Sequence, residues 1–91
     1  MLLVSARYYN IVANLLGRRQ EQRTVPPGTT MRELVVALAE ESPSFQNLAF
    51  TASGQVSGHL RLFRNMQVVN DLDEPLADGD EIRFFPAVSG G

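Results

Sequence analysis

The feature that most restricts how this chain can fold is an amphipathic helix near its middle. Its apolar residues recur at the spacing of one helical face, i, i+3, i+4 and i+7, at Met31, Leu34, Val35 and Leu38. Thr30 and Glu33 have the spacing of a capping box, in which each side chain accepts a hydrogen bond from a backbone N–H that the helix leaves without a partner. Pro43 disfavours helical geometry in the residue before it, so the helix should end by Ser42.

Segments with the alternation typical of strands lie on both sides of this helix. Residues 2–9 place one set of side chains on a common inward face, namely Leu2, Val4, Ala6 and Tyr8. Residues 59–64 and 81–84 alternate in the same way, and residues 66–69 can add a brief strand. Residues 18–25 are nearly all polar, which suits a sheet edge, where charges discourage pairing with other chains. Strands, a helix and then further strands predict an α+β fold in the β-grasp order.

The remaining segments are less regular. Residues 10–16 have the spacing of a helical turn that closes at Gly17. Residues 44–50 predict an irregular turn that contributes Phe45, Leu48 and Phe50 to the core. Residues 51–58 are small and polar, which predicts a mobile loop. No segment has the composition of a linker between two domains.

Composition excludes several classes of function. The 91 residues are 44% hydrophobic and 20% charged, which is typical of one soluble globular domain. A net charge of −2 gives no electrostatic basis for binding nucleic acid. No apolar run approaches the roughly 18 residues of a membrane span, and neither cysteine nor the pattern of a signal peptide is present. We therefore expect a cytoplasmic protein that binds no membrane.

The residues of common catalytic sites are also missing. The single histidine, His59, is expected on the surface or at the start of a strand. Neither a nucleophile–base pair nor a nucleotide-binding loop is present. Six acidic residues lie between Asp71 and Glu81, but Pro75 stands where a calcium loop would need a ligand. This segment therefore forms either solvated turns or an acidic patch that meets a basic partner. We expect no metal site and no bound cofactor in the protein.

The end of the chain carries its most specific pattern. Asp78-Gly79 predicts a turn, residues 81–84 a short strand, and Pro86 the end of that strand, because proline has no N–H to donate. Beyond it, one valine stands among small residues, in the order Ala87, Val88, Ser89, Gly90 and Gly91. We therefore expect a β-grasp domain over residues 1–86 and a flexible C-terminal Gly-Gly tail over residues 87–91.

This ending, which runs through Phe84-Phe85-Pro86 to Gly90-Gly91, resembles the MoaD/ThiS family of ubiquitin-like sulfur carriers, and within it the small subunits of molybdopterin synthase. The resemblance implies a ubiquitin-like β-grasp, with a mixed sheet packed against one main helix. It also implies that the first and last strands are parallel neighbours in the middle of the sheet. Many members have Asn-Gly between the two middle strands, where this chain has Asn65-Met66, so a type I′ turn is not expected there.

The resemblance further implies chemistry at the terminus. Because an ionised carboxylate is a poor electrophile, an activating enzyme related to those of ubiquitin would adenylate Gly91 with ATP. A sulfur donor would convert the adenylate into a thiocarboxylate, with Gly90 as a small spacer. The large catalytic subunit of molybdopterin synthase would then use this sulfur on a pyranopterin precursor, so that the chain itself is a carrier and not an enzyme.

Three other functions are compatible with the same ending. One is a sulfur carrier for another pathway, such as thiazole, cysteine or tRNA thiolation. Another is a covalent protein modifier that is joined through Gly91 to lysines. The third is a binding module whose Gly-Gly tail is inert.

Two adjacent phenylalanines lie just before the tail. Successive side chains of a strand point to opposite faces, so if Phe84 faces the core, Phe85 must point outward. An outward aromatic residue next to Pro86 predicts a partner-binding surface, because aromatic side chains dominate such contacts. The alternative is that another part of the chain covers Phe85.

Overall fold

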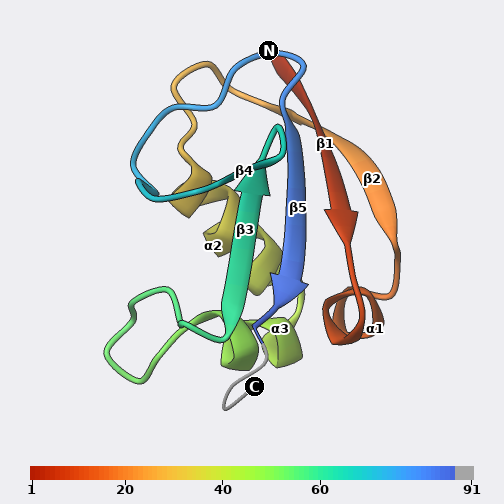
Figure 1. The fold of residues 1–91 in the computed structure, drawn as a ribbon, viewed down its shortest axis with the longest axis vertical. Coiled ribbons are helices and arrows are strands. Elements are labelled where there is room, and N and C mark those ends of the chain that lie inside the picture. Colours follow the sequence, from red (N-terminus) through yellow and green to blue (C-terminus); the bar gives the residue numbers. More distant parts are fainter. Residues whose placement is uncertain (88–91) are drawn as a thin grey trace.

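A mixed sheet of five strands forms the centre of the computed structural model, which describes residues 1–87. The strands are β1 (Leu2–Tyr8), β2 (Gln20–Val25), β3 (Leu60–Arg64), β4 (Gln67–Val68) and β5 (Glu81–Pro86). Their order in the sheet is β2-β1-β5-β3-β4, and β1 and β5 are parallel while the other neighbours are antiparallel (Figure 1). The parallel pairing of the first and last strands is confirmed, as is the edge position of the polar strand β2.

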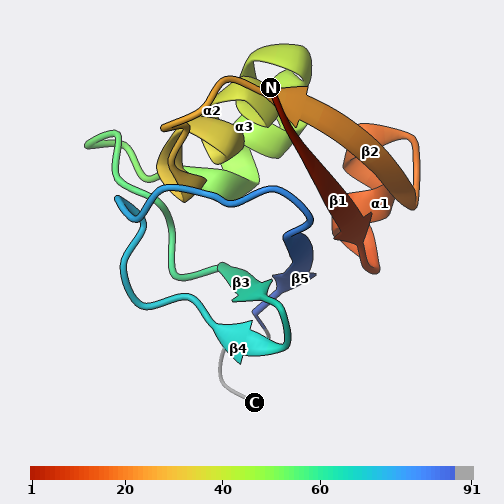
Figure 2. The same ribbon diagram turned by 90° about the horizontal axis from the view of Figure 1, so that it is seen from above.

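Helices lie on one side of this sheet (Figure 2). They are α1 (Ile11–Leu16), α2 (Met31–Glu41) and α3 (Pro43–Ala49). The core between the two layers contains the inward side chains predicted for the strands, Val4, Ala6, Tyr8, Leu60, Leu62, Ile82 and Phe84, and the apolar face of α2. Within residues 1–87, no helix is long and apolar enough to cross a membrane.

The predicted start and end of α2 are both confirmed. The Thr30 amide donates to the Glu33 carboxylate at 2.9 Å, and the Glu33 amide donates to the Thr30 hydroxyl at 3.2 Å, which together form the capping box. The helix ends at Glu41, and Ser42 follows in an extended conformation, as Pro43 requires of the residue before it.

The prediction of an irregular turn over residues 44–50 is wrong, because this segment forms the helix α3. Pro43 occupies its first turn, where the missing N–H costs nothing and the fixed φ angle suits a helix. The Ser42 hydroxyl caps the helix by accepting from the Phe45 amide at 3.2 Å. The proline that ends α2 therefore also begins α3. Phe45 is buried in the core as predicted. Leu48 and Phe50 are only partly buried and pack against the edge of this core.

The expectation that Asn65-Met66 disfavours a type I′ turn is also wrong. Both residues have positive φ angles, 51° and 72°, as the two central residues of that turn require. The Asn65 side chain explains how the turn forms without glycine. Its amide group donates to Asp80 at 2.8 Å, and its carbonyl accepts from the Glu81 amide at 2.9 Å. These bonds fasten the hairpin to the start of β5 and offset the strain of a left-handed methionine.

Candidate functional site

The candidate site is the end of β5, which we call the strand end and define as Phe85, Pro86 and Ala87. Strand β5 lies between β1 and β3, so both neighbours hold this segment (Figure 1). On one side the Tyr9 amide donates to the Phe84 carbonyl at 3.1 Å. On the other side the Ala87 amide donates to the His59 carbonyl at 2.8 Å, one residue beyond β5. Strand β5 is thus held by hydrogen bonds on both flanks close to its end, at Phe84 on the β1 side and at Ala87 on the β3 side.

The residues predicted to carry the chemistry follow this fixed point. Ala87 is half-buried and fixed to His59, so the structure places the first residue of the predicted tail. The other four, Val88, Ser89, Gly90 and Gly91, lie outside the described residues. Their role and the division of the chain at residue 86 stay predictions. His59 is exposed and directly precedes β3, in agreement with the expectation for it.

The predicted orientations of the two phenylalanines are confirmed. Phe84 is fully buried in the core, and Phe85 points to the opposite face of the sheet, where it is half-buried. The Phe85 ring stacks on Tyr9 with centroids 4.2 Å apart and planes 6° from parallel. Phe63 meets the same ring edge-on, at 5.4 Å and 82°. We call Tyr9, Phe63 and Phe85 the aromatic cluster.

Only Phe85 of this cluster could be predicted from the sequence to lie on a binding surface. The alternation of residues 2–9 and 59–64 already places Tyr9 and Phe63 outward. It does not tell which strands are neighbours, however, so it cannot bring the two rings to Phe85. The pairing of β5 with both β1 and β3 does that. Partner binding by Phe85 and Pro86 stays a prediction, but the outward aromatic surface is larger than one side chain.

Charged side chains border the aromatic cluster. The Arg83 guanidinium donates to the Tyr9 hydroxyl at 3.2 Å and pairs with Glu81 at 2.7 Å. Arg7 pairs with the same carboxylate at 3.4 Å. One acidic group is therefore shared by two arginines on this face of the sheet.

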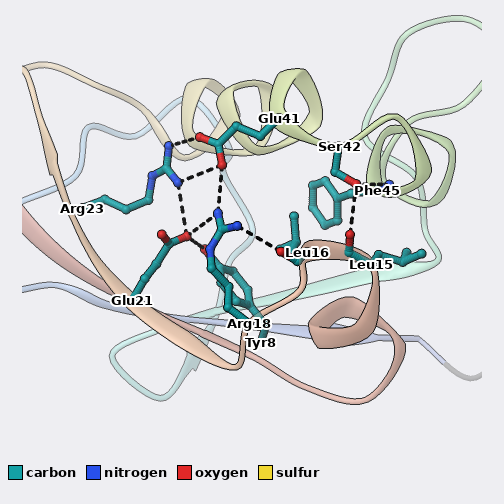
Figure 3. A network of polar contacts seen from close by, with 9 residues as sticks. All are labelled: Tyr8, Leu15, Leu16, Arg18, Glu21, Arg23, Glu41, Ser42 and Phe45. Atoms are coloured by element: carbon teal, nitrogen blue, oxygen red, sulfur yellow. Dashed lines mark hydrogen bonds and ion pairs between the residues drawn. The ribbon is translucent and has the colours of Figure 1, made fainter.

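On the opposite face of the sheet, a polar network links β1, β2 and α2 (Figure 3). The Tyr8 ring packs on Phe84 with centroids 5.2 Å apart, and its hydroxyl donates to Glu21. Arg18 and Arg23 each bridge Glu21 to Glu41, at distances between 2.6 and 3.2 Å. The network ties the end of α2 to the sheet edge.

The network shifts the protonation equilibria of its members. Burial raises the pKa of the Tyr8 hydroxyl well above its ordinary value, and the hydrogen bond to Glu21 raises it further. The hydrogen bond from Arg23 is the main cause that lowers the pKa of the Glu41 carboxyl. Tyr8 is therefore held neutral as a donor and Glu41 is held ionised as an acceptor.

A raised Tyr8 pKa has a measurable consequence for stability. The unfolded tyrosine ionises near its ordinary pKa of 10.0, whereas the folded one stays neutral. The contribution of its hydroxyl is therefore complete below pH 10 and is lost as the pH rises further. We expect Tyr8→Phe to cost about 1.5–3 kcal/mol at neutral pH, the value of a hydrogen bond to a charged group. The difference between the free energies of unfolding of the two proteins, measured in urea, should narrow above pH 10. A gap that stays constant would show that Tyr8 does not donate to Glu21.

Among the residues that the structure describes, no group of three or more histidine, aspartate or glutamate side chains could hold a metal ion. The acidic residues of the 71–80 segment instead bind within the protein. Asp73 pairs with Arg32 at 2.9 Å, and Asp80 is buried and pairs with Arg64 at 2.8 Å. These carboxylates are therefore bound by arginines of the same chain.

Residues 6–91 match the model of the ThiS family. This chain belongs to the ThiS family. The match leaves out only the first five residues and extends through Gly91, so the resemblance suggested by the ending holds over nearly the entire sequence. Members of this family are small ubiquitin-like sulfur carriers and modifiers.

Individual relatives agree with the family match. Small archaeal modifier protein 1 from Haloferax volcanii is 31% identical over 80 residues, which cover 88% of this chain and 91% of that protein. A crystal structure of that protein superposes with a TM-score of 0.85, at 28% identity over 98% of this chain and 99% of the other. These values confirm the ubiquitin-like β-grasp fold of the ThiS-family chain.

Two further structures share the fold at lower identity. A putative molybdopterin converting factor subunit 1 from Pyrococcus furiosus has a TM-score of 0.81 and 24% identity, over 97% of this chain and all of the other. One chain of a complex between subunits 1 and 2 of the molybdopterin-converting factor from Helicobacter pylori has a TM-score of 0.63 and 21% identity, over 99% of this chain and 100% of that chain. Each shows the same fold as this ThiS-family chain.

Proposed function

We propose that this protein is a sulfur carrier that holds sulfur as a thiocarboxylate on Gly91 and serves as the small subunit of molybdopterin synthase. The observation that carries the proposal is the Gly90-Gly91 ending, which lies inside the family match and follows a central strand fixed on both flanks. From Ala87 onward, Val88 to Gly91 can extend roughly 13 Å at about 3.3 Å per residue. A carboxylate at that point can enter an enclosed partner site without a side chain beside it.

The chemistry requires three partners in sequence. In an adenylating activating enzyme, the Gly91 carboxylate attacks the α-phosphorus of ATP, forms an acyl-adenylate and releases pyrophosphate. A sulfide-level donor then attacks the acyl carbon and displaces AMP, which leaves a thiocarboxylate. In the large synthase subunit the thiocarboxylate sulfur bonds to the pyranopterin precursor, and water then cleaves the acyl C–S bond, which leaves the sulfur on the precursor and regenerates the carboxylate. The carrier binds no cofactor of its own in this scheme.

The choice of the molybdopterin pathway is supported by structural relatives whose names include a molybdopterin converting factor. One of these is described as a complex of subunits 1 and 2, so a protein of this fold assembles with a second subunit. Sulfur carriage for thiazole, cysteine or tRNA thiolation would use the same Gly91 chemistry with a different receiving enzyme. The proposal therefore contains a general step, thiocarboxylate formation, and a specific one, delivery to the pterin.

The general step is tested by intact mass. The protein is incubated with its cognate activating enzyme, ATP and sulfide, and we expect a mass increase equal to the replacement of one oxygen by one sulfur. Fragmentation should place the change on Gly91. The specific step is tested by adding the large synthase subunit and the pyranopterin precursor, which should return the mass to its original value. An unchanged mass in the first reaction would overturn sulfur carriage altogether.

A second function, covalent modification of proteins, is favoured by one observation. The relative with 31% identity is a small archaeal modifier protein. This chain contains no lysine, because all eight of its basic residues are arginines. It can thus donate its terminus to a lysine of another protein but cannot receive one on a side chain.

The missing lysines make a clear prediction for the activating reaction. With ATP and activating enzyme we expect an adenylate, or a thiocarboxylate when a sulfide donor is also added, and in neither case a lysine-linked ladder of this protein. Peptide mapping after denaturing electrophoresis checks the result. A ladder linked through any side chain would contradict the chemistry. Conjugates on the lysines of added cell proteins would instead favour the modifier function over the carrier function.

A further inference from the structure

A hollow of about 610 Å³ lies at the end of β1, between that strand and α1. Its lining includes two arginines and several uncharged polar side chains, namely Arg7, Arg19, Tyr9, Asn10, Asn14 and Gln20. None of the described residues that line it is acidic. Guanidinium and carboxamide groups can all donate hydrogen bonds, so the lining favours an occupant rich in acceptors and negative charge.

Neither arginine of the hollow is neutralised by a carboxylate inside it. Arg7 pairs with Glu81 at 3.4 Å, but Glu81 lies outside the lining and also pairs with Arg83 at 2.7 Å. Arg19 is exposed and forms no ion pair with any of residues 1–87. The protein as a whole carries a charge of −2. The hollow is therefore a local positive region on an acidic protein, which is a basis for selective attraction.

The hollow is next to the strand end. Strands β1 and β5 are parallel, with Tyr8 paired to Phe84, so both strands end at the same side of the molecule (Figure 1). Tyr9 belongs to both features, because it lines the hollow and stacks on Phe85 at 4.2 Å. A protein that holds the C-terminal segment in its own site would face the aromatic cluster and the hollow together.

We propose that this hollow receives a carboxylate-rich segment of the activating enzyme, which docks beside the aromatic cluster while the C-terminal segment enters the adenylation site. The inference rests on the proposed function, in that it assumes such an enzyme takes the terminus. Aspartate and glutamate side chains supply the acceptors that the arginines and carboxamides can bind, with Arg19 able to form a two-point contact. Charges at the rim of an interface govern the rate of encounter and its dependence on salt.

A first experiment tests the hollow without the enzyme. A short capped oligoglutamate peptide is titrated into the labelled full chain and followed by amide NMR. We expect shifts at Arg7, Asn10, Asn14 and Arg19 in about 20 mM salt that disappear near 500 mM, where the Debye length is only a few ångströms. The double variant Arg7→Gln/Arg19→Gln should lose them. Shifts confined to other residues, or unchanged in the double variant, would overturn the proposal.

A second experiment measures recognition by the cognate activating enzyme. We expect Arg7→Gln/Arg19→Gln to raise the KM for the carrier about tenfold at low salt with kcat nearly unchanged, and the difference should shrink at high salt. Arg32→Gln, which removes an arginine from the start of α2 where it pairs with Asp73, serves as the control and should change KM less than about twofold. Equal effects of both changes would contradict docking at the hollow.

A titration with inorganic phosphate tests whether the hollow is instead a phosphate site. If phosphate at low millimolar concentration shifts the same amides more strongly than the peptide does, the hollow is a phosphate site and the docking proposal fails. Failure of the proposed function has a different signature. In that case the enzyme leaves the wild-type carrier unmodified, whereas the peptide titration still shows whether the hollow binds carboxylates.

Discussion

Deletion of Gly91 will abolish thiocarboxylate formation while the melting temperature of the protein stays almost unchanged. The deletion shortens the chain by about 3.3 Å, which leaves the carboxylate of Gly90 short of the α-phosphate of ATP. Misplacement by about 1 Å can already lower a rate by ~100-fold, so a larger displacement should prevent reaction. The sheet and its helices lie within residues 1–87, which the deletion does not touch.

The matched variant adds one alanine after Gly91. It moves the carboxylate past the phosphate and places a Cβ where the proposed site expects none, so activation should fall as steeply as in the deletion. Both proteins are assayed beside wild type by intact mass and by thermal melting. Activation of either variant at close to the wild-type rate would show that the Gly91 carboxylate is not the reacting group.

The adjacent phenylalanines should separate folding from binding. Phe84 is fully buried, and Phe84→Ala should lower the free energy of unfolding by roughly 3–5 kcal/mol through lost contacts and a cavity. Phe85 contacts Tyr9 and Phe63 on the outer face, so Phe85→Ala should cost about 1–2 kcal/mol for two aromatic pairs. Its main effect should be a loss of partner affinity of about 10- to 30-fold, as for an interface anchor.

Urea unfolding and calorimetric titration with the large synthase subunit measure the two effects. Phe84→Leu provides a control that keeps most of the buried volume and should retain partner binding. Equal losses of stability in both alanine variants, together with unchanged partner affinity for Phe85→Ala, would show that Phe85 is a core residue and not part of a binding surface.

Local patterns account for much of this fold. The capping box of Thr30 and Glu33 and the apolar face of α2 could be predicted because each depends on residues a few positions apart. The inward face of β1 and the opposite orientations of Phe84 and Phe85 follow from strand alternation alone. The helix α3 does not follow from the same local rules, because Pro43 is compatible both with the end of α2 and with the first turn of a new helix.

Features that depend on distant residues could not be predicted in the same way. The turn at Asn65-Met66 forms because Asn65 binds Asp80 and Glu81, which lie about fifteen positions away in the chain. The aromatic cluster needs three neighbouring strands, and the hollow needs α1 folded beside the end of β1. Single segments contain no information about such pairings, so the sequence indicated one anchor, Phe85, where the structure shows a surface.

The central position of β5 has a consequence for the synthesis of the protein. Its partners β1 and β3 are made earlier, but β5 separates them in the sheet and contributes Ile82 and Phe84 to the core. Until residues 81–86 emerge from the ribosome, β1 has an unpaired edge and the sheet is divided in two. Pairing between such distant strands is a slow step in folding. A truncated or stalled nascent chain that lacks residues 81–86 therefore has neither the complete core nor the aromatic cluster.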